Sequence, residues 1–126
     1  MGAPMRRILI VDDHGPSRRL ASLILGGAGW QTQEAMRGDQ ALAMLAEHDY
    51  DCVLLDVSMP DMSGEAVCRA IRGNPQMAKV RVVAYTAHAM THERARILEI
   101  GFDDIVVKPA TMARLMDAVA GIAAHA

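Results

Sequence analysis

The stretch that decides the fold is Cys-Val-Leu-Leu-Asp-Val-Ser-Met-Pro-Asp-Met-Ser-Gly, at residues 52–64. Residues 53–55 form an unbroken apolar run, which is typical of a strand buried on both faces in a parallel sheet. The run ends at Asp56, Pro60 lacks a backbone donor, and residues 61–64 favour a turn. Asp56 is therefore expected at the carboxyl end of an interior strand, where ligands collect in open α/β sheets.

Further apolar segments, separated by segments of helical periodicity, flank this stretch on both sides. The predicted strands lie at residues 6–11, 30–35, 53–56, 80–85 and 104–107, the second of them at an edge. The predicted helices lie at residues 16–27, 39–47, 64–72, 88–100 and 111–122. This alternation predicts an α/β fold, in which right-handed crossovers place helices on both faces of a five-stranded parallel sheet.

Apolar spacing also predicts which helix faces point inward. In the first helix, Leu20, Leu23 and Ile24 recur at helical spacing, and the fourth helix has a short stripe at Ala95 and Leu98. Residues three and four apart share a helix face, so we expect these side chains to be buried.

Length and composition limit the class of protein. The 126 residues suffice for one domain, predicted at residues 6–122 with loose tails at 1–5 and 123–126. A net charge of −2 argues against nucleic-acid binding, which favours a basic face. The sequence contains neither a long apolar run nor a signal peptide. Cys52 and Cys68 lack metal-type spacing and suggest reduced core thiols, so we expect a cytoplasmic protein that does not bind membranes.

Chemically distinctive side chains stand at the ends of four predicted strands. They are Asp12 and Asp13, Asp56, Thr86 and Lys108. Because the carboxyl ends of parallel strands meet at one edge of a sheet, these side chains should converge. Two carboxylates about 4 Å apart repel by roughly 4 kcal/mol at an effective dielectric of 20, so three of them favour a bound cation. An all-oxygen site of this size suits Mg²⁺.

The same set of residues suits phosphoryl transfer. Lys108 adds one positive charge, so three carboxylates, one ammonium and a divalent ion sum to zero. Asp56 is the natural nucleophile, since a carboxylate can form an acyl phosphate. The Thr86 hydroxyl can bond a phosphoryl oxygen, while Lys108 and the metal offset charge on the transferring group.

These motifs together resemble the receiver domain of bacterial two-component response regulators, including the chemotaxis regulators. The similarity is carried by residues 8–13 (Ile-Leu-Ile-Val-Asp-Asp), residues 54–60 (Leu-Leu-Asp-Val-Ser-Met-Pro), Thr86-Ala87 and Lys108-Pro109. It extends over about residues 6–122. The resemblance implies a flavodoxin-like receiver fold with strand order 2-1-3-4-5. It also implies a phosphorylation-activated signalling switch that catalyses only its own phosphorylation and dephosphorylation, rather than an enzyme.

The resemblance further assigns a role to each site residue. Asp56 is expected to accept a phosphoryl group from a histidine kinase or a histidine phosphotransfer protein. Asp13 and Asp56 are expected to bind Mg²⁺ directly, together with the backbone carbonyl of Ser58, while Asp12 acts largely through water. Thr86 and Lys108 are expected to contact the phosphoryl group, and the Lys108-Pro109 peptide bond is expected to be cis.

One position departs from the family pattern. Receivers often carry Tyr or Phe three residues before the lysine, where the ring turns inward on activation, and here that position is Ile105. Thr86 and Ile105 are therefore the residues expected to report phosphorylation. We expect the fourth helix, fifth strand and fifth helix to form the surface for a downstream protein, with Met90 and Met112 able to line it.

Several alternatives remain open from the sequence. Asp12-Asp13 fits a plain helix cap, and His14 fits a solvated loop residue. Ser58 and His88 are hypothesised to flank the site and tune the loss of the phosphoryl group to water. A phosphate-independent receiver-like scaffold and a metal-dependent phosphohydrolase of haloacid-dehalogenase type are alternative functions. No output domain follows residue 122, which fits a stand-alone receiver or a piece of a longer protein. The kinase, the target, the process and the oligomeric state are not specified.

Overall fold

A computed structural model describes residues 6–87 and 91–121 of the chain. Five strands alternate with five helices in this part of the sequence, as predicted. The strands are β1 (Arg7–Val11), β2 (Gln31–Ala35), β3 (Cys52–Asp56), β4 (Arg81–Thr86) and β5 (Asp104–Val107). The helices are α1 (Gly15–Gly27), α2 (Gly38–Glu47), α3 (Gly64–Gly73), α4 (Thr91–Ile100) and α5 (Met112–Ala120).

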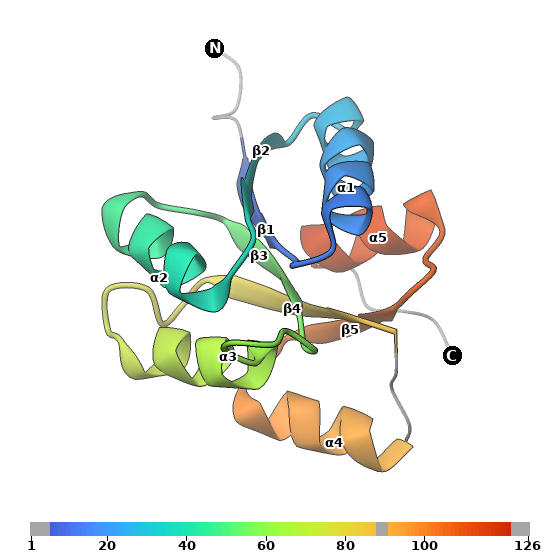
Figure 1. The fold of residues 1–126 in the computed structure, drawn as a ribbon. Coiled ribbons are helices and arrows are strands. Elements are labelled where there is room, and N and C mark those ends of the chain that lie inside the picture. The colour runs from blue at the N-terminus through green and yellow to red at the C-terminus, as the bar shows by residue number, and fades with distance from the viewer. Residues whose placement is uncertain (1–5, 88–90, 122–126) are drawn as a thin grey trace.

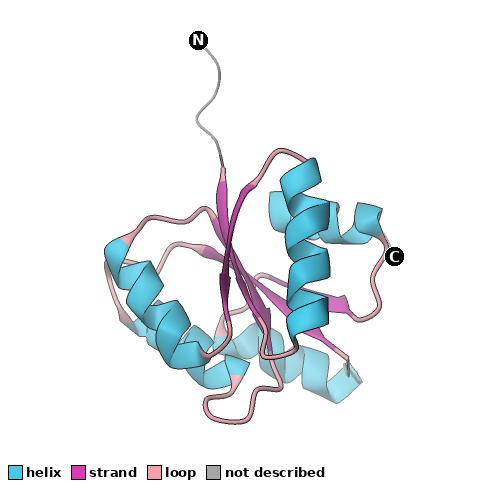
Figure 2. Cartoon of the chain, turned by 45° about the horizontal axis from the view of Figure 1, so that its top comes forward, coloured by secondary structure: helices cyan, strands magenta, loops and turns pink. Residues whose placement is uncertain are grey.

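The strands form one parallel sheet of order β2-β1-β3-β4-β5, which confirms the expected order. Figure 1 shows α1 and α5 on one face of this sheet and α2, α3 and α4 on the other. Figure 2 shows the twisted strands between the two helical layers. All five residues of β3 are buried, so the strand that ends at Asp56 is an interior strand. The polar strand β2 lies at an edge, as predicted.

A separate apolar core lies on each face of the sheet. Leu9 and Val53 pack with residues of α2, α3 and α4, whereas Ile8 and Leu54 pack with residues of α1 and α5. Neighbouring residues enter opposite cores because successive side chains of a strand point to opposite faces.

The predicted inward face of α4 is wrong, and that of α1 is right only for Ile24, which is partly buried and packs against the core. In α1, Leu20 and Leu23 are 56% and 67% exposed, and the buried residues are Ala21 and Leu25. The residues that pack against a sheet are decided by how the helix is rotated, and small residues such as Ala21 allow the closest approach. In α4, Ala95 and Leu98 are exposed, and the residue in the core is Ile97.

Three helices begin with side-chain caps. The Ser17 amide donates to Nδ1 of His14 at the start of α1 over 3.2 Å. His14 therefore caps this helix, and neither Asp12 nor Asp13 does. Ser63 and Thr111 accept hydrogen bonds from backbone amides at the starts of α3 and α5. Each cap satisfies an amide that has no partner within its helix.

The end of the sheet opposite the site is held together by Arg72 at the end of α3. Its guanidinium donates to the carbonyl oxygens of Gly101 and Ala78 over 2.9 and 2.8 Å, and it pairs with Asp103 over 2.8 Å. Gly101 has a φ of +129°, which favours glycine, and a Cβ there would lie 2.9 Å from Cγ of Arg72. The half-buried guanidinium of Arg72 thus joins the segments that enter β4 and β5.

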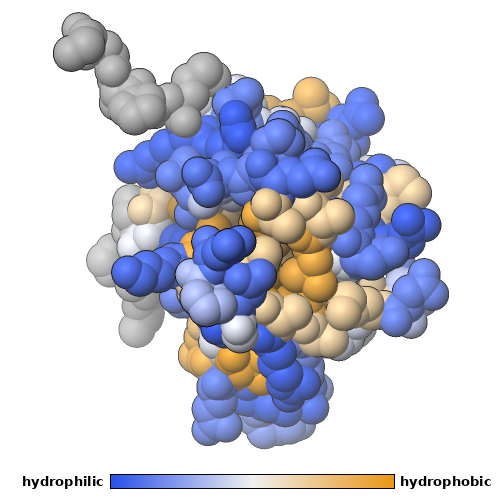
Figure 3. All heavy atoms as spheres, turned by 90° about the vertical axis from the view of Figure 1, so that its left-hand side faces the viewer, coloured by the Kyte–Doolittle hydropathy of each residue, from blue (hydrophilic) through white to orange (hydrophobic). Residues whose placement is uncertain are grey.

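The surface has polar and apolar regions. Figure 3 views the side of the molecule that bears α2 in Figure 1, and it shows apolar residues gathered in the middle of this face, framed by hydrophilic ones. Among residues 6–87 and 91–121, no helix is both long enough and apolar enough to cross a membrane. In the same residues, the larger exposed apolar side chains are Leu20, Leu23, Met36, Leu98, Val107 and Met112.

Candidate functional site

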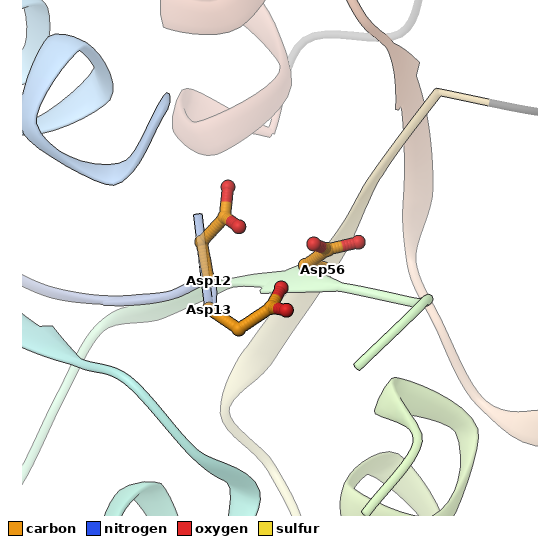
Figure 4. A group of neighbouring side chains, drawn as sticks. All are labelled: Asp12, Asp13 and Asp56. Carbon is orange, nitrogen blue, oxygen red and sulfur yellow. The ribbon is translucent and has the colours of Figure 1, made fainter. Parts of the chain in front are cut away.

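Three carboxylates meet at the carboxyl edge of the sheet. Asp12 and Asp13 follow β1, and Asp56 is the last residue of the neighbouring β3. Carboxylate oxygens of all three lie within 4.8 Å of one another. Figure 4 shows the Asp13 side chain extending toward Asp56, with Asp12 beside them. The structure therefore brings together acids that are more than 40 residues apart in the sequence.

Lys108, which follows β5, reaches across β4 to these acids. Its Nζ lies 2.8 Å from Oδ2 of Asp12 and 3.6 Å from Oδ2 of Asp56. The lysine side chain is 19% exposed, and the two carboxylates are largely buried. Low exposure reduces screening by water, so these charges interact more strongly than a surface ion pair would. Asp12 is the closer partner of the ammonium in this state.

The two buried acids have opposite pKa shifts. Burial raises the pKa of Asp56 to about 6, opposed by the Ser58 amide and by Lys108 and assisted by Asp12. Burial also acts to raise the pKa of Asp12, but hydrogen bonds from Lys108 and the His14 amide outweigh it, and the pKa lies below its usual value. Asp12 thus keeps its charge to lower pH than Asp56 does, while burial makes the charge on Asp56 unfavourable.

The loop after Asp56 is folded closely onto the strand end. The Ser58 amide donates to Oδ1 of Asp56 over 3.0 Å, and the side chain of Ser58 is exposed. The Gly64 amide donates to the carbonyl of Val57 over 3.0 Å. A Cβ on Gly64 would lie only 2.3 Å from the backbone oxygen of Asp56, so α3 can start here only with glycine. This packing sets the direction of the Asp56 carboxylate.

Thr86 and Ile105 occupy adjacent strands on the same side of the site. Thr86 ends β4, is buried, and accepts a hydrogen bond on its backbone oxygen from the Lys108 amide over 2.8 Å. The Lys108-Pro109 bond is cis, as expected. Ile105 is 3% exposed and packs in the core that contains Ile97. His88, which was hypothesised to flank the site, lies outside the described residues, and so does Met90.

Two residues near the site were not identified from the sequence. The ring of Tyr85 lies under the Lys108 ammonium, 4.7 Å from Nζ to the ring centroid. Arg18 donates from Nη1 to the backbone oxygen of Asp12 over 2.8 Å and pairs with Glu34 on β2. The position of Tyr85, next to Thr86 at the end of a strand, could have indicated that its ring lies near the site. The contact of Arg18 could not be predicted, because no sequence pattern indicates that a side chain will bond to a backbone oxygen such as that of Asp12.

The donor set fits a magnesium ion. The clustered groups are carboxylates, and the loop beside them adds backbone carbonyls, so the available donors are the hard oxygen atoms that Mg²⁺ prefers. Burial raises the pKa of Asp56 although Lys108 acts to lower it, so a further positive charge beside the three acids would favour the ionised form. A bound divalent cation would supply that charge.

Comparison with known proteins decides the family. The family model described as the response regulator receiver domain matches residues 8–120. The chain belongs to this family. The match covers both acid-bearing strand ends and the lysine, and the observed strand order is that of the resemblance inferred from the sequence.

Receiver domains of several organisms are similar to this chain. The sensor histidine kinase RcsC of Salmonella typhi is 40% identical over 114 residues, covering 90% of this chain and 12% of the kinase. The transcriptional regulatory protein ResD of Bacillus subtilis is 38% identical over 103 residues, covering 82% of this chain and 42% of ResD. The chain therefore spans less than half the length of these curated relatives.

Solved structures of receiver domains have the same fold. The chemotaxis protein CheY4 of Vibrio cholerae superposes with a TM-score of 0.89 at 26% identity, over 95% of this chain and all of CheY4. The signal receiver domain of a signal transduction histidine kinase from Syntrophus aciditrophicus has a TM-score of 0.80 at 29% identity, over 96% of this chain and 95% of that domain.

Proposed function

We propose that this receiver domain is a phosphorylation-activated switch in which Asp56 accepts a phosphoryl group from a histidine kinase or a histidine phosphotransfer protein. The observation that carries the proposal is the convergence of Asp12, Asp13 and Asp56 with Lys108 at one edge of the sheet. The family match supports it over the phosphohydrolase alternative. The proposed unit is residues 6–122, with tails at 1–5 and 123–126, acting in the cytoplasm.

In the proposed reaction, an Asp56 carboxylate oxygen attacks the phosphorus of a phosphohistidine. The P–N bond breaks, the imidazole nitrogen keeps its electron pair, and a P–O bond to Asp56 forms. Attack of water on the same phosphorus later releases inorganic phosphate and restores the carboxylate. Lys108, 3.6 Å from Asp56, is placed to follow the negative charge onto the phosphoryl oxygens. The Thr86 hydroxyl is proposed to bond one of these oxygens.

Mg²⁺ is the proposed cofactor. Asp13, Asp56 and the Ser58 carbonyl would hold it directly, with Asp12 acting through water. When bound, the ion would offset negative charge on the transferring phosphoryl group. Asp13 is exposed whereas Asp12 is fully buried and paired with Lys108, and this difference suits the two acids for direct and indirect contact respectively.

The proposed output is a change of the α4–β5–α5 surface, to which a downstream protein binds. Leu98 of α4, Val107 of β5 and Met112 of α5 are 49%, 37% and 59% exposed. Apolar side chains of this size on adjoining elements suit a protein interface. Ile105 is already buried among core residues, so the change would proceed without the inward turn of an aromatic ring.

The proposal is tested by incubating the protein with Mg²⁺ and a small acyl phosphate, followed by intact mass measurement and mapping of the modified residue. We expect a gain of one phosphoryl group on Asp56, which requires Mg²⁺ and is abolished in Asp56→Asn. Asp61→Asn, which removes an exposed acid of the same loop, is the matched control and should be modified normally. An unmodified wild-type protein would refute the proposal. Partner binding that is unaffected by Asp56→Asn would support the phosphate-independent scaffold.

A further inference from the structure

Lys108 has a third contact besides its two carboxylate partners. Its Nζ lies 4.7 Å from the centroid of the Tyr85 ring, well within the range of a cation–π interaction. Tyr85 is only 7% exposed, and its ring belongs to the core shared with α1 and α5. Partial burial of both groups strengthens the attraction, because little water competes for the ammonium.

Sheet pairing explains why this ring lies beside the site. Tyr85 is paired with Asp56 on one side and with Val106 on the other. Successive side chains of β4 enter opposite cores, with Ala84 in one and Tyr85 in the other. Tyr85 is therefore next to the proposed phosphoacceptor, Asp56, on one side. On the other side it is next to Val106, which is two residues before Lys108.

The ring contact differs in kind from the two ion pairs. An ammonium group has three N–H donors, and the carboxylates of Asp12 and Asp56 can take two of them. An aromatic face attracts the positive charge without an oxygen acceptor, so a donor remains for a phosphoryl oxygen. Asp12 alone would draw the flexible lysine away from Asp56, since Nζ lies 2.8 Å from Asp12 and 3.6 Å from Asp56.

We propose that Tyr85 is a positioning residue, whose aromatic ring holds the Lys108 ammonium between Asp12 and Asp56 before the phosphoryl group arrives. The inference that this contact aids phosphoryl transfer rests on the proposed function of Asp56, whereas the contact itself does not. The ring is what matters, so phenylalanine at position 85 preserves the effect and an aliphatic residue removes it.

The contact is tested by nuclear magnetic resonance of protein labelled with ¹³C-lysine. The chain has only two lysines, Lys79 and Lys108, so Lys79→Arg assigns both signals. We expect the Lys108 Cε–Hε signal of the wild type to be shifted upfield by the ring current of Tyr85. The shift persists in Tyr85→Phe and disappears in Tyr85→Leu, while the exposed Lys79 provides an internal reference. A Lys108 signal at the Lys79 position in the wild type would overturn the contact without need of any variant.

The role in transfer is tested by the rate of phosphorylation from a small acyl phosphate with Mg²⁺. We expect Tyr85→Leu to be slowed about fivefold, a factor typical of the loss of one cation–π contact, and Tyr85→Phe to match the wild type. A Tyr85→Leu protein that loses the ring-current shift yet reacts at the wild-type rate overturns the positioning role. Failure of every variant and the wild type to react refutes the function of Asp56 instead, and the Lys108 signal still decides the contact.

Discussion

Asp12 and Asp56 are chemically identical side chains that the structure uses differently. The ammonium of Lys108 lies 2.8 Å from Asp12 and 3.6 Å from Asp56, so it is 0.8 Å closer to Asp12. Asp12 therefore keeps its negative charge, whereas burial raises the pKa of Asp56 to about 6. A carboxylate that is costly to ionise is a reactive nucleophile once a cation enters, because the structure then no longer opposes its charge.

The first prediction concerns stability and pH at Asp56. In metal-free buffer at pH 7.5, Asp56→Asn should raise the free energy of unfolding by about 2 kcal/mol, because the wild type must hold an unfavourable charge. Folding raises the pKa of Asp56 from 3.8 to about 6. Between pH 3.8 and pH 6, the native state therefore binds a proton at Asp56 that the unfolded state has lost. The stability that protonation provides is present below pH 3.8 and is lost as the pH rises through 6.

The measurement is urea unfolding of both proteins between pH 4 and pH 8, with a chelator present. The advantage of Asp56→Asn should shrink steadily as the pH falls from 7 to 4. Asp49→Asn is the control, since this exposed acid lies in the loop that precedes the same strand, away from the site. A stability difference between Asp56→Asn and the wild type that stays constant over this range would contradict the raised pKa.

At the scale of elements, α3 is fitted to the end of β3. The helix begins at Gly64, whose position leaves no room for a Cβ against the backbone of Asp56 and Val57. Its Ser63 cap accepts from the Ala66 amide over 3.2 Å. The first turn of the helix therefore supports the end of β3, and the cap and the glycine in the loop specify that support locally.

The second prediction compares two glycines at the two ends of α3. Gly64→Ala should lower the free energy of unfolding by about 2 kcal/mol or more, because the new Cβ would lie 2.3 Å from the Asp56 oxygen. Gly73→Ala should leave stability unchanged or raise it by up to about 1 kcal/mol, since nothing lies within 4 Å of its Cβ. Equal effects of the two substitutions in urea unfolding would show that α3 does not pack this tightly on β3.

At the scale of the whole molecule, the site joins segments from most of the length of the chain. Asp12 and Lys108 are 96 positions apart and form an ion pair. The groups proposed to hold a cation are together only when the sheet is complete, so the unfolded chain offers no equivalent site. Binding of a divalent ion at this edge must therefore stabilise the entire fold.

The third prediction is that Mg²⁺ stabilises the protein through the three acids. At about one hundred times its dissociation constant, Mg²⁺ should raise the free energy of unfolding by about 3 kcal/mol. Asp13→Asn should lose most of this gain, because Asp13 supplies one of the clustered carboxylates. Thermal unfolding with and without Mg²⁺, at constant ionic strength, measures the effect.

Asp61→Asn is the matched control for this measurement. Asp61 is exposed and lines a cavity of about 190 Å³ together with Asp13, but it does not belong to the acid cluster. Its stabilisation by Mg²⁺ should equal that of the wild type. An equal loss in both variants would indicate that Mg²⁺ acts through general charge screening and not through a specific site.

The sequence by itself determined the order of the elements and the residues that end each strand. The apolar run before Asp56 and the polar residues after it describe an interior strand, since alternation and burial leave a local pattern. The convergence of Asp12, Asp13 and Asp56 followed from parallel strands alone. Lys108 could be placed near them by the same reasoning, because the carboxyl ends of all parallel strands lie at one edge.

Only the tertiary structure decided which residues of a helix face the sheet and which side chains pair at the site. It placed Ala21 and Leu25 of α1 against the sheet and left Leu23 exposed, because the rotation of a helix depends on the surface it packs against. It also paired Lys108 more closely with Asp12 than with Asp56 and placed the Tyr85 ring beneath it. Distances of a few tenths of an ångström between side chains on different strands leave no pattern along the chain.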